Sequence, residues 1–257
     1  MRRLLTPLII FLCLNVIPVT LSANPPELPV RKSHFLVSYL GIPVLDCYQD
    51  FRVKDSLITV VYDNQIKPFW AKFSDVHNIY AATFTTADFL PRNDAKEISE
   101  GAFTQSFSAT YDEPSRQLLV DSGERLPWPQ GFRSVFSAVH YLERFSSEIT
   151  YPTRLAILIE GAQWRAEIVD LGTTSLSITG EAILTRHLRA TLQPDGQNAK
   201  RLTGRTDILM EFLTTPGSTL ELWIDETPRI VRAKVGEFPK AVVLELVKKD
   251  VMTRETD

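Results

Sequence analysis

Most of this chain alternates apolar and polar residues, which is the period of a β-strand with one buried face. The clearest case is the segment 103–111, where Phe103, Phe107 and Tyr111 share one face and the opposite face carries only threonine and serine. Turn-forming pairs such as Pro216-Gly217 separate the alternating segments. The pattern predicts strands over 34–42, 44–53, 57–62, 79–86, 103–111, 116–121, 154–160, 164–168, 175–184, 186–192, 206–213, 218–224, 229–235 and 241–247.

One central segment has the period of a helix instead. Its apolar residues recur at spacings of three and four, at Phe132, Val135, Phe136, Val139, Leu142 and Phe145. Two prolines, Pro127 and Pro129, precede the segment, where the residue is tolerated. The spacing predicts an amphipathic helix over 132–145, and a second, shorter helix is expected over 69–75.

Many strands joined by tight turns, with one helix between them, define the expected fold class. We predict a mainly β protein, built as a curved antiparallel sheet or open half-barrel with one central amphipathic helix packed on it. A chain of 257 residues suits one large β domain. We expect that domain over 34–249, after a proline-rich lead over 24–33 and before a charged tail over 250–257.

The first 23 residues are typical of a secretory signal peptide. A basic start over 1–3 is followed by a mostly apolar run over 4–21 and by the small residues Ser22 and Ala23. Prolines interrupt the apolar run, which is shorter than the roughly 20 residues that a spanning helix needs. Cleavage near Ala23 predicts a periplasmic protein that is not integral to the membrane; the alternative is an uncleaved anchor.

The charge and cysteine content of the chain indicate which partners it is expected to bind and whether disulfides can stabilise it. Without the leader, 26 basic residues face 31 acidic ones, a net charge of −5. Charges of both signs are scattered, so the basic patch of a nucleic-acid binder is not expected. Cys47 is the one cysteine outside the leader, which leaves no internal disulfide, and its strand-like surroundings predict a buried thiol.

The chain contains none of the short motifs that carry common chemistry. It has no phosphate-binding glycine loop, no nucleophile elbow and no paired zinc ligands, so we predict no catalytic residue, no metal site and no cofactor. His140 and Glu143, three apart on the central helix, are the nearest approach to a ligand pair, and a structural role is expected for them. The acidic pair Asp225-Glu226 is expected to form a turn between strands.

Aromatic residues on the predicted strands offer the one candidate binding site. If they point into a concave sheet, they form the mostly apolar lining that ligand pockets have. The alternative is that they pack beneath the central helix as ordinary core. The candidate pocket residues are Phe103, Phe107, Tyr111, Trp164 and Trp223.

Several short segments resemble a bacterial exported family known only as domain of unknown function 3108. They are Tyr39–Pro43, His140–Arg144, Leu222–Glu226, Arg229–Arg232 and Leu244–Leu246. The resemblance runs over about 34–249, and the chain departs from it at Leu45, where the family's opening motif reaches a glycine. It implies a periplasmic antiparallel β half-barrel, similar in outline to carriers that hold lipid in a concave sheet, and it implies no catalytic residues.

Three functional hypotheses remain open from the sequence. The first is a non-enzymatic periplasmic protein that binds a lipid-like ligand or an envelope partner in its concave sheet. The second is an envelope glycan hydrolase whose two carboxylates the sequence does not single out. The third is a structural adaptor that pairs with a partner strand through a sheet edge.

Overall fold

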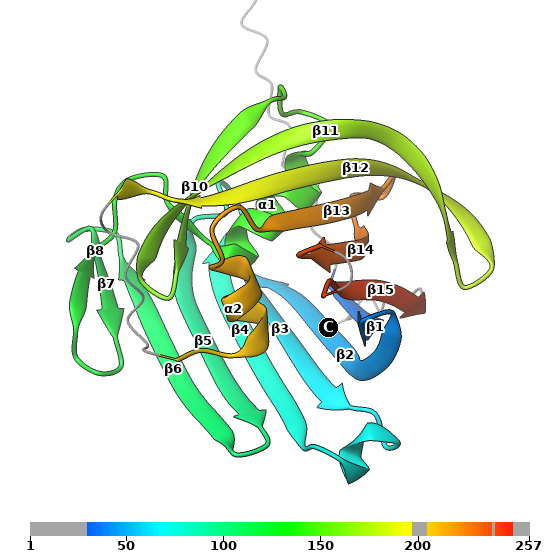
Figure 1. The fold of residues 1–257 in the computed structure, drawn as a ribbon. Helices are drawn as coiled ribbons and strands as arrows, with labels where there is room; N and C mark the ends of the chain where they lie inside the picture. The colour runs from blue at the N-terminus through cyan, green and yellow to red at the C-terminus, as the bar shows by residue number, and fades with distance from the viewer. Residues whose placement is uncertain (1–29, 197–204, 238–239, 249–257) are drawn as a thin grey trace, which may run out of the picture.

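The computed structural model describes residues 30–196, 205–237 and 240–248. They form one sheet of 15 strands with two short α-helices and one 3-10 turn (Figure 1). The first eight strands are β1 (Arg31–Tyr39), β2 (Ile42–Lys54), β3 (Leu57–Ile66), β4 (Val76–Thr85), β5 (Pro91–Glu100), β6 (Phe103–Asp112), β7 (Gln117–Val120) and β8 (Arg125–Pro127). The others are β9 (Arg133–Ser134), β10 (Thr153–Ile159), β11 (Ala162–Ile178), β12 (Glu181–Pro194), β13 (Thr219–Asp225), β14 (Ile230–Val235) and β15 (Val242–Lys248).

The strand order shows how the sheet curves into a half-barrel. Strands β8 to β1 are neighbours in reverse chain order, β1 then pairs with β15, and β15 to β9 continue in reverse order. The two edge strands, β8 and β9, are therefore consecutive in the chain. All pairings are antiparallel except the short contact between β9 and β10. The fold class predicted from the alternation is confirmed.

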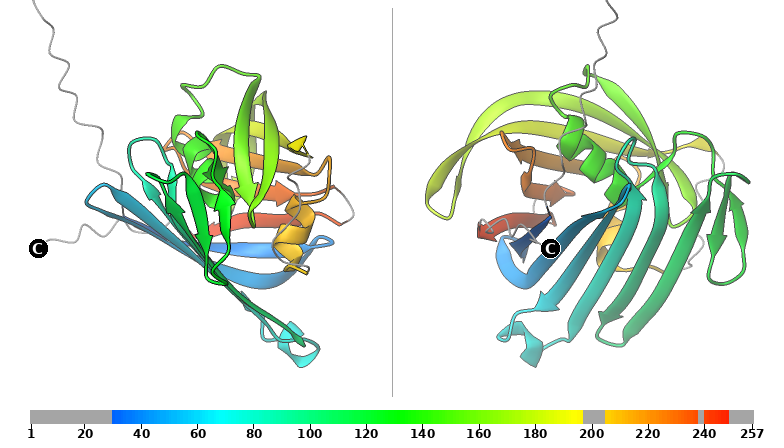
Figure 2. Two further views of the ribbon diagram at one scale, coloured as in Figure 1. Left: turned by 90° about the vertical axis from the view of Figure 1, so that its left-hand side faces the viewer. Right: turned by 180° about the vertical axis from the view of Figure 1, so that it is seen from behind.

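The central helix α1 (Val135–Phe145) lies inside the curve of the sheet (Figures 1 and 2). Ser134 caps its N-terminus by accepting a hydrogen bond from the backbone N–H of Ser137. Ala138 and Leu142 pack with β10 to β13, whereas Phe136 and Phe145 pack with β2 to β4. Because it is apolar on both sides, the helix fills the space between the two halves of the sheet.

The structure corrects three predicted strands. The segments expected as single strands over 34–42 and 175–184 each contain a hairpin turn, at 40–41 between β1 and β2 and at 179–180 between β11 and β12. The segment expected as a strand over 206–213 contains helix α2 (Ile208–Leu213), which begins at Asp207. The Asp207 carboxylate accepts a hydrogen bond from the Met210 N–H (3.0 Å), so an N-cap decides the local structure. Strand β5 was not predicted, since its sequence is rich in charged and polar residues, and the short helix expected over 69–75 is a 3-10 turn, η1 (Trp70–Lys72).

The proposed domain boundaries remain predictions. The leader over 1–23 and the tail over 250–257 lie outside the described residues. Strand β1 begins at Arg31, three residues before the expected start of the domain at His34. Among the described residues, no helix has the length and apolar character needed to cross a bilayer.

Candidate functional site

The polar face of α1 takes part in a buried chain of hydrogen bonds. The Arg31 guanidinium of β1 donates to both carboxylate oxygens of Glu143, each at 2.6 Å. His140 Nδ1 lies 2.5 Å from Glu143 Oε2, and His140 Nε2 lies 2.9 Å from the Tyr62 hydroxyl of β3. Gln49 of β2 in turn donates to the Tyr62 oxygen at 2.9 Å. The network ties the helix to three neighbouring strands.

The charge of Glu143 determines how this network is organised. Burial by itself raises the pKa of the Glu143 carboxyl, but Arg31 and His140 outweigh it and lower the pKa to about 2. The carboxylate also accepts a hydrogen bond from the Ile230 N–H at 2.9 Å. An ionised Glu143 accepts only, so Nδ1 of His140 carries the proton of the hydrogen bond between them.

A carboxylate, an imidazole and a phenol in series could in principle perform acid–base chemistry. Here, however, His140 is only 1% exposed and both of its ring nitrogens have protein partners. Both oxygens of Glu143 are likewise occupied. The arrangement therefore neutralises Arg31 and fixes α1, in line with the structural role expected for His140 and Glu143.

A second buried cluster anchors α2. The Lys96 ammonium of β5 pairs with Glu160, with the Asp207 carboxylate (2.8 Å) and with the Thr206 hydroxyl (2.9 Å). The Tyr80 hydroxyl donates to the other Asp207 oxygen at 2.8 Å. The Lys96 and Asp207 side chains are 4% and 0% exposed. This cluster connects β4, β5 and the β10–β11 turn with Asp207, the N-cap residue of α2.

Two further sequence predictions are confirmed by the geometry. Cys47 is buried, and burial raises the pKa of its thiol to about 12, so a reactive thiolate is not available near neutral pH. Asp225 ends β13 and accepts hydrogen bonds from the N–H groups of Thr227 and Arg229, which makes Asp225-Glu226 a turn. Within the described part of the chain, no cluster of three or more His, Cys, Asp or Glu residues could hold a metal ion.

The five candidate pocket aromatics do not come together. Phe103 and Trp164 pack in the core around α1. Phe107 and Tyr111 belong to a separate cluster at the β8–β9 side of the sheet. Trp223 lies in a third cluster and stacks on the His187 ring, with centroids 4.2 Å apart. The expected shared face of Phe103, Phe107 and Tyr111 is present, but a single pocket lined by all five residues is not formed.

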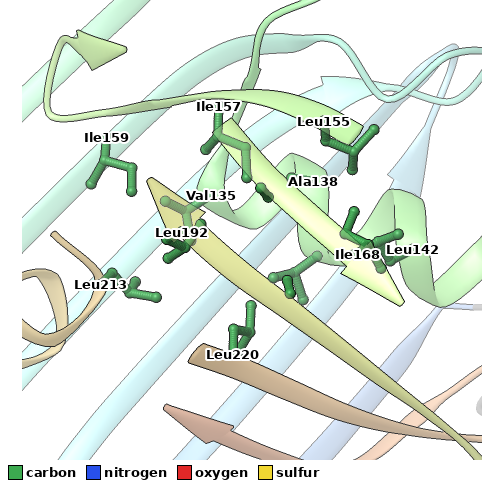
Figure 3. A pocket seen from close by; sticks show the side chains of 13 residues that line it. Val135, Ala138, Leu142, Leu155, Ile157, Ile159, Ile168, Leu192, Leu213 and Leu220 are labelled. Atoms are coloured by element: carbon green, nitrogen blue, oxygen red, sulfur yellow. The ribbon is translucent and has the colours of Figure 1, made fainter. Parts of the chain in front are cut away.

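The interior does contain a small apolar cavity between α1 and strands β10 to β13 (Figure 3). Its volume is about 20 Å³, enough for about one water molecule. Sites for drug-sized ligands measure about 300–1,000 Å³. Its lining includes Ala138, Leu142, Ile168, Ala190 and Leu213, and none of the five candidate aromatics. The side chains of helix α1 therefore fill most of the space between the helix and strands β10 to β13.

The largest exposed aromatic side chains lie outside the barrel, on the loop that joins β3 to β4. Phe69 and Phe73 are 63% and 74% exposed. Their rings pack around Trp70, with centroids 4.9 Å apart for Phe69 and Trp70 and 6.3 Å apart for Trp70 and Phe73. The Trp70 indole N–H donates to the Pro43 carbonyl at 2.9 Å, which fixes the loop against the start of β2. We call Phe69, Trp70 and Phe73 the aromatic tip.

A neighbouring turn adds to this exposed end of the sheet. Leu40 and Ile42, in and after the β1–β2 turn, are 48% and 47% exposed, and Ile42 precedes the residue that Trp70 contacts. Figures 1 and 2 show the β3–β4 loop projecting from the body of the molecule, away from α1. This surface was not among the predicted sites. Its signal in the sequence is the run Phe69-Trp70-Ala71-Lys72-Phe73, which has three aromatic residues in five and follows a proline.

Comparison with known proteins extends the fold assignment. No family model and no curated protein matches this chain. Among solved structures, a β-barrel-like protein of domain of unknown function DUF1849 from Brucella abortus is similar with a TM-score of 0.54, at 4% identity, over 86% of this chain and 97% of that chain. A DUF1089 family protein from Pseudomonas aeruginosa is 10% identical over 80% and 91% of the two chains, with a TM-score of 0.33, which supports no argument. The chain thus has a β-barrel-like fold that it shares with a protein domain of unknown function.

Proposed function

We propose that this chain is a non-enzymatic protein of the bacterial periplasm, exported by its leader, that binds an amphipathic lipid-like ligand or an envelope partner at the exposed end of its half-barrel. The aromatic tip carries the proposal. Exposed apolar groups grouped in this way mark interaction sites on soluble domains. The leader over 1–23 and the resemblance to the exported family of domain of unknown function 3108 support the location.

We propose a binding site on the surface of the half-barrel rather than inside it, because α1 fills the space within the curve of the sheet. A cavity of about 20 Å³ leaves no room for an acyl chain unless α1 is displaced. Displacing α1 would break the ion pair between Arg31 and Glu143 and the bonds of His140. The aromatic tip needs no such rearrangement, because Phe69 and Phe73 already face solvent.

The two rival hypotheses have less support from the geometry. For a glycan hydrolase, Glu143, Glu160 and Asp207 are buried and paired with cations rather than set on the two sides of a cleft. For an adaptor that pairs through a sheet edge, the edge strands are only three and two residues long, and β8 ends in Pro127. Short edges and proline both hinder strand addition.

Native mass spectrometry of the mature chain with monomeric lysophosphatidylglycerol tests the binding proposal. We expect the wild type and the cavity-filling variant Ala190→Val to bind the lipid, and the double variant Phe69→Ser/Phe73→Ser to lose most of the bound fraction. Binding that Ala190→Val abolishes and the double variant keeps would instead place the ligand inside the barrel. A wild type that binds neither lysolipid nor any crosslinked envelope partner would overturn the proposal.

Cell fractionation tests the location separately. The chain recovered from the periplasm should begin near Asn24. A chain that keeps its leader and stays in the cytosol would contradict it.

A further inference from the structure

We infer that the aromatic tip inserts into the surface of a lipid bilayer, so that the protein docks on a membrane through the β3–β4 loop. This inference rests on the proposed function and names the bilayer as the partner. Tryptophan and phenylalanine favour the boundary between headgroups and acyl chains, and apolar side chains in that boundary hold proteins at a membrane surface.

The aromatic tip has a form suited to insertion. Phe69 meets the Trp70 ring edge-on at an interplanar angle of 88°, and Phe73 contacts both. The hydrogen bond from Trp70 to the Pro43 carbonyl holds the rings in place before binding. A preformed group of side chains loses little conformational entropy when it binds.

The size of the aromatic tip favours a bilayer over a protein partner. One aromatic side chain buries about 150–250 Å² at most. Three rings that already cover one another in part fall short of the roughly 800 Å² that each partner contributes to a standard protein–protein interface. Insertion into a bilayer sets no such minimum area, because each ring that leaves water contributes independently.

The charge nearest the three rings is a lysine. Lys67 and Lys72 lie between the acidic residues Asp63 and Asp75, and the exposed Asp75 follows Phe73 by two residues. Lys67 pairs with Asp46 at 3.0 Å, whereas Lys72 is exposed within η1, directly between Trp70 and Phe73. A lysine in this position can contact anionic lipid headgroups while the neighbouring rings insert.

Tryptophan fluorescence gives a site-specific readout. Trp128, Trp164 and Trp223 are buried, with exposed fractions of 0%, 3% and 8%, so Trp70 is the tryptophan whose surroundings a membrane can change most. We expect vesicles of phosphatidylethanolamine and phosphatidylglycerol to shift the emission of the mature chain to shorter wavelength. Trp70→Phe should lose this shift and still sediment with the vesicles.

Co-sedimentation of variants with the same vesicles measures the contribution of the rings. Phe69→Ser/Phe73→Ser should weaken partitioning about tenfold or more, since two exposed phenylalanines no longer leave water. The matched control is Leu171→Ser/Leu184→Ser, which removes two side chains that are 44% and 51% exposed on the β11–β12 hairpin and should partition like the wild type. Lys72→Glu should weaken binding to these vesicles and not to vesicles of phosphatidylcholine.

Three results would overturn the inference. If the wild type binds monomeric lysophosphatidylglycerol but no vesicles, a bilayer is not the partner, and the proposed function is unaffected. A photo-crosslinker at position 69 that captures protein and no lipid in the envelope would identify a protein partner instead. Failure to bind lysolipid, vesicle or crosslinked partner would remove both the inference and the proposed function.

Discussion

At the scale of single residues, Asp94 is a half-buried acid whose environment disfavours its charge. It shares a face of β5 with Lys96, and it accepts a hydrogen bond from the Tyr111 hydroxyl of β6 at 2.6 Å. Burial raises the pKa of the Asp94 carboxyl to about 6, and the hydrogen bond from Tyr111 only partly opposes that effect. The folded chain therefore binds a proton here at a pH at which the unfolded chain has released it.

This shift predicts how stability changes with pH. Because the folded pKa lies above the unfolded one, the contribution of Asp94 to the free energy of unfolding declines as pH rises from about 4 to 6 and is constant above that range. Asp94→Asn removes this decline and should raise the free energy of unfolding at pH 7.5 by about 1–3 kcal/mol relative to wild type, with no gain at pH 4. Urea denaturation at a series of pH values measures it; a variant less stable than wild type at pH 7.5 would show that the carboxylate is stabilised by its site.

At the scale of elements, α2 shows how a cap and an ion pair together define a short helix. Six residues are too few for a helix to be stable by itself. Asp207 supports it twice, since one carboxylate oxygen accepts from the Met210 N–H and the other pairs with Lys96. The buried side chains of Met210 and Leu213 then hold the helix against the interior.

Two substitutions at Asp207 separate these contributions. Asp207→Asn retains a good N-cap but removes the charge beside Lys96, whereas Asp207→Ala removes both. We expect Asp207→Ala to lower the free energy of unfolding by about 3–5 kcal/mol and Asp207→Asn to lower it by about 1 kcal/mol less. Urea denaturation gives the two values, and hydrogen exchange at the Met210 amide should speed up more in Asp207→Ala. Equal losses in the two variants would mean that the cap contributes nothing.

At the scale of the whole molecule, the sheet is open on one side, where its two edge strands are held together by side chains. The edge strands β8 and β9 do not pair with each other, and residues 128–132 join them. Trp128 is fully buried there, its indole N–H donates to the Phe132 carbonyl at 3.0 Å, and its ring meets Tyr111 edge-on at 5.2 Å. Leu158 of β10 belongs to the same apolar cluster, so side chains connect the two halves where backbone pairing is missing.

Truncation of this tryptophan should therefore loosen the half-barrel as a unit. Trp128→Ala should lower the free energy of unfolding by about 3–5 kcal/mol, as is usual when a buried tryptophan is reduced to alanine. Phe73→Ala is the matched control, because its ring is 74% exposed and its loss should change stability by no more than about 0.5 kcal/mol. Thermal and urea denaturation compare the two, and similar small losses in both would show that the connection over 128–132 does not hold the halves together.

The sequence by itself determined the β-rich architecture, the central helix and the buried state of Cys47. Both the alternation of a strand and the spacing of a helix can be read within a short stretch of the chain. A strand such as β6 and the helix α1 can therefore be predicted from the local pattern. Strand β5 was missed for the complementary reason: Lys96 occupies an inward position that only its ion pairs with Glu160 and Asp207 make favourable.

Only the tertiary structure decided which aromatic side chains are buried and which are exposed. The five candidate aromatics separated into different clusters because the curvature of the sheet, which strand spacing does not encode, sends their faces to different parts of the core. Whether the interior is open or filled depends on the position of α1 between the two halves of the sheet. The exposure of Phe69 and Phe73 depends likewise on contacts between distant segments, since the Trp70–Pro43 hydrogen bond fixes their loop across 27 residues of chain.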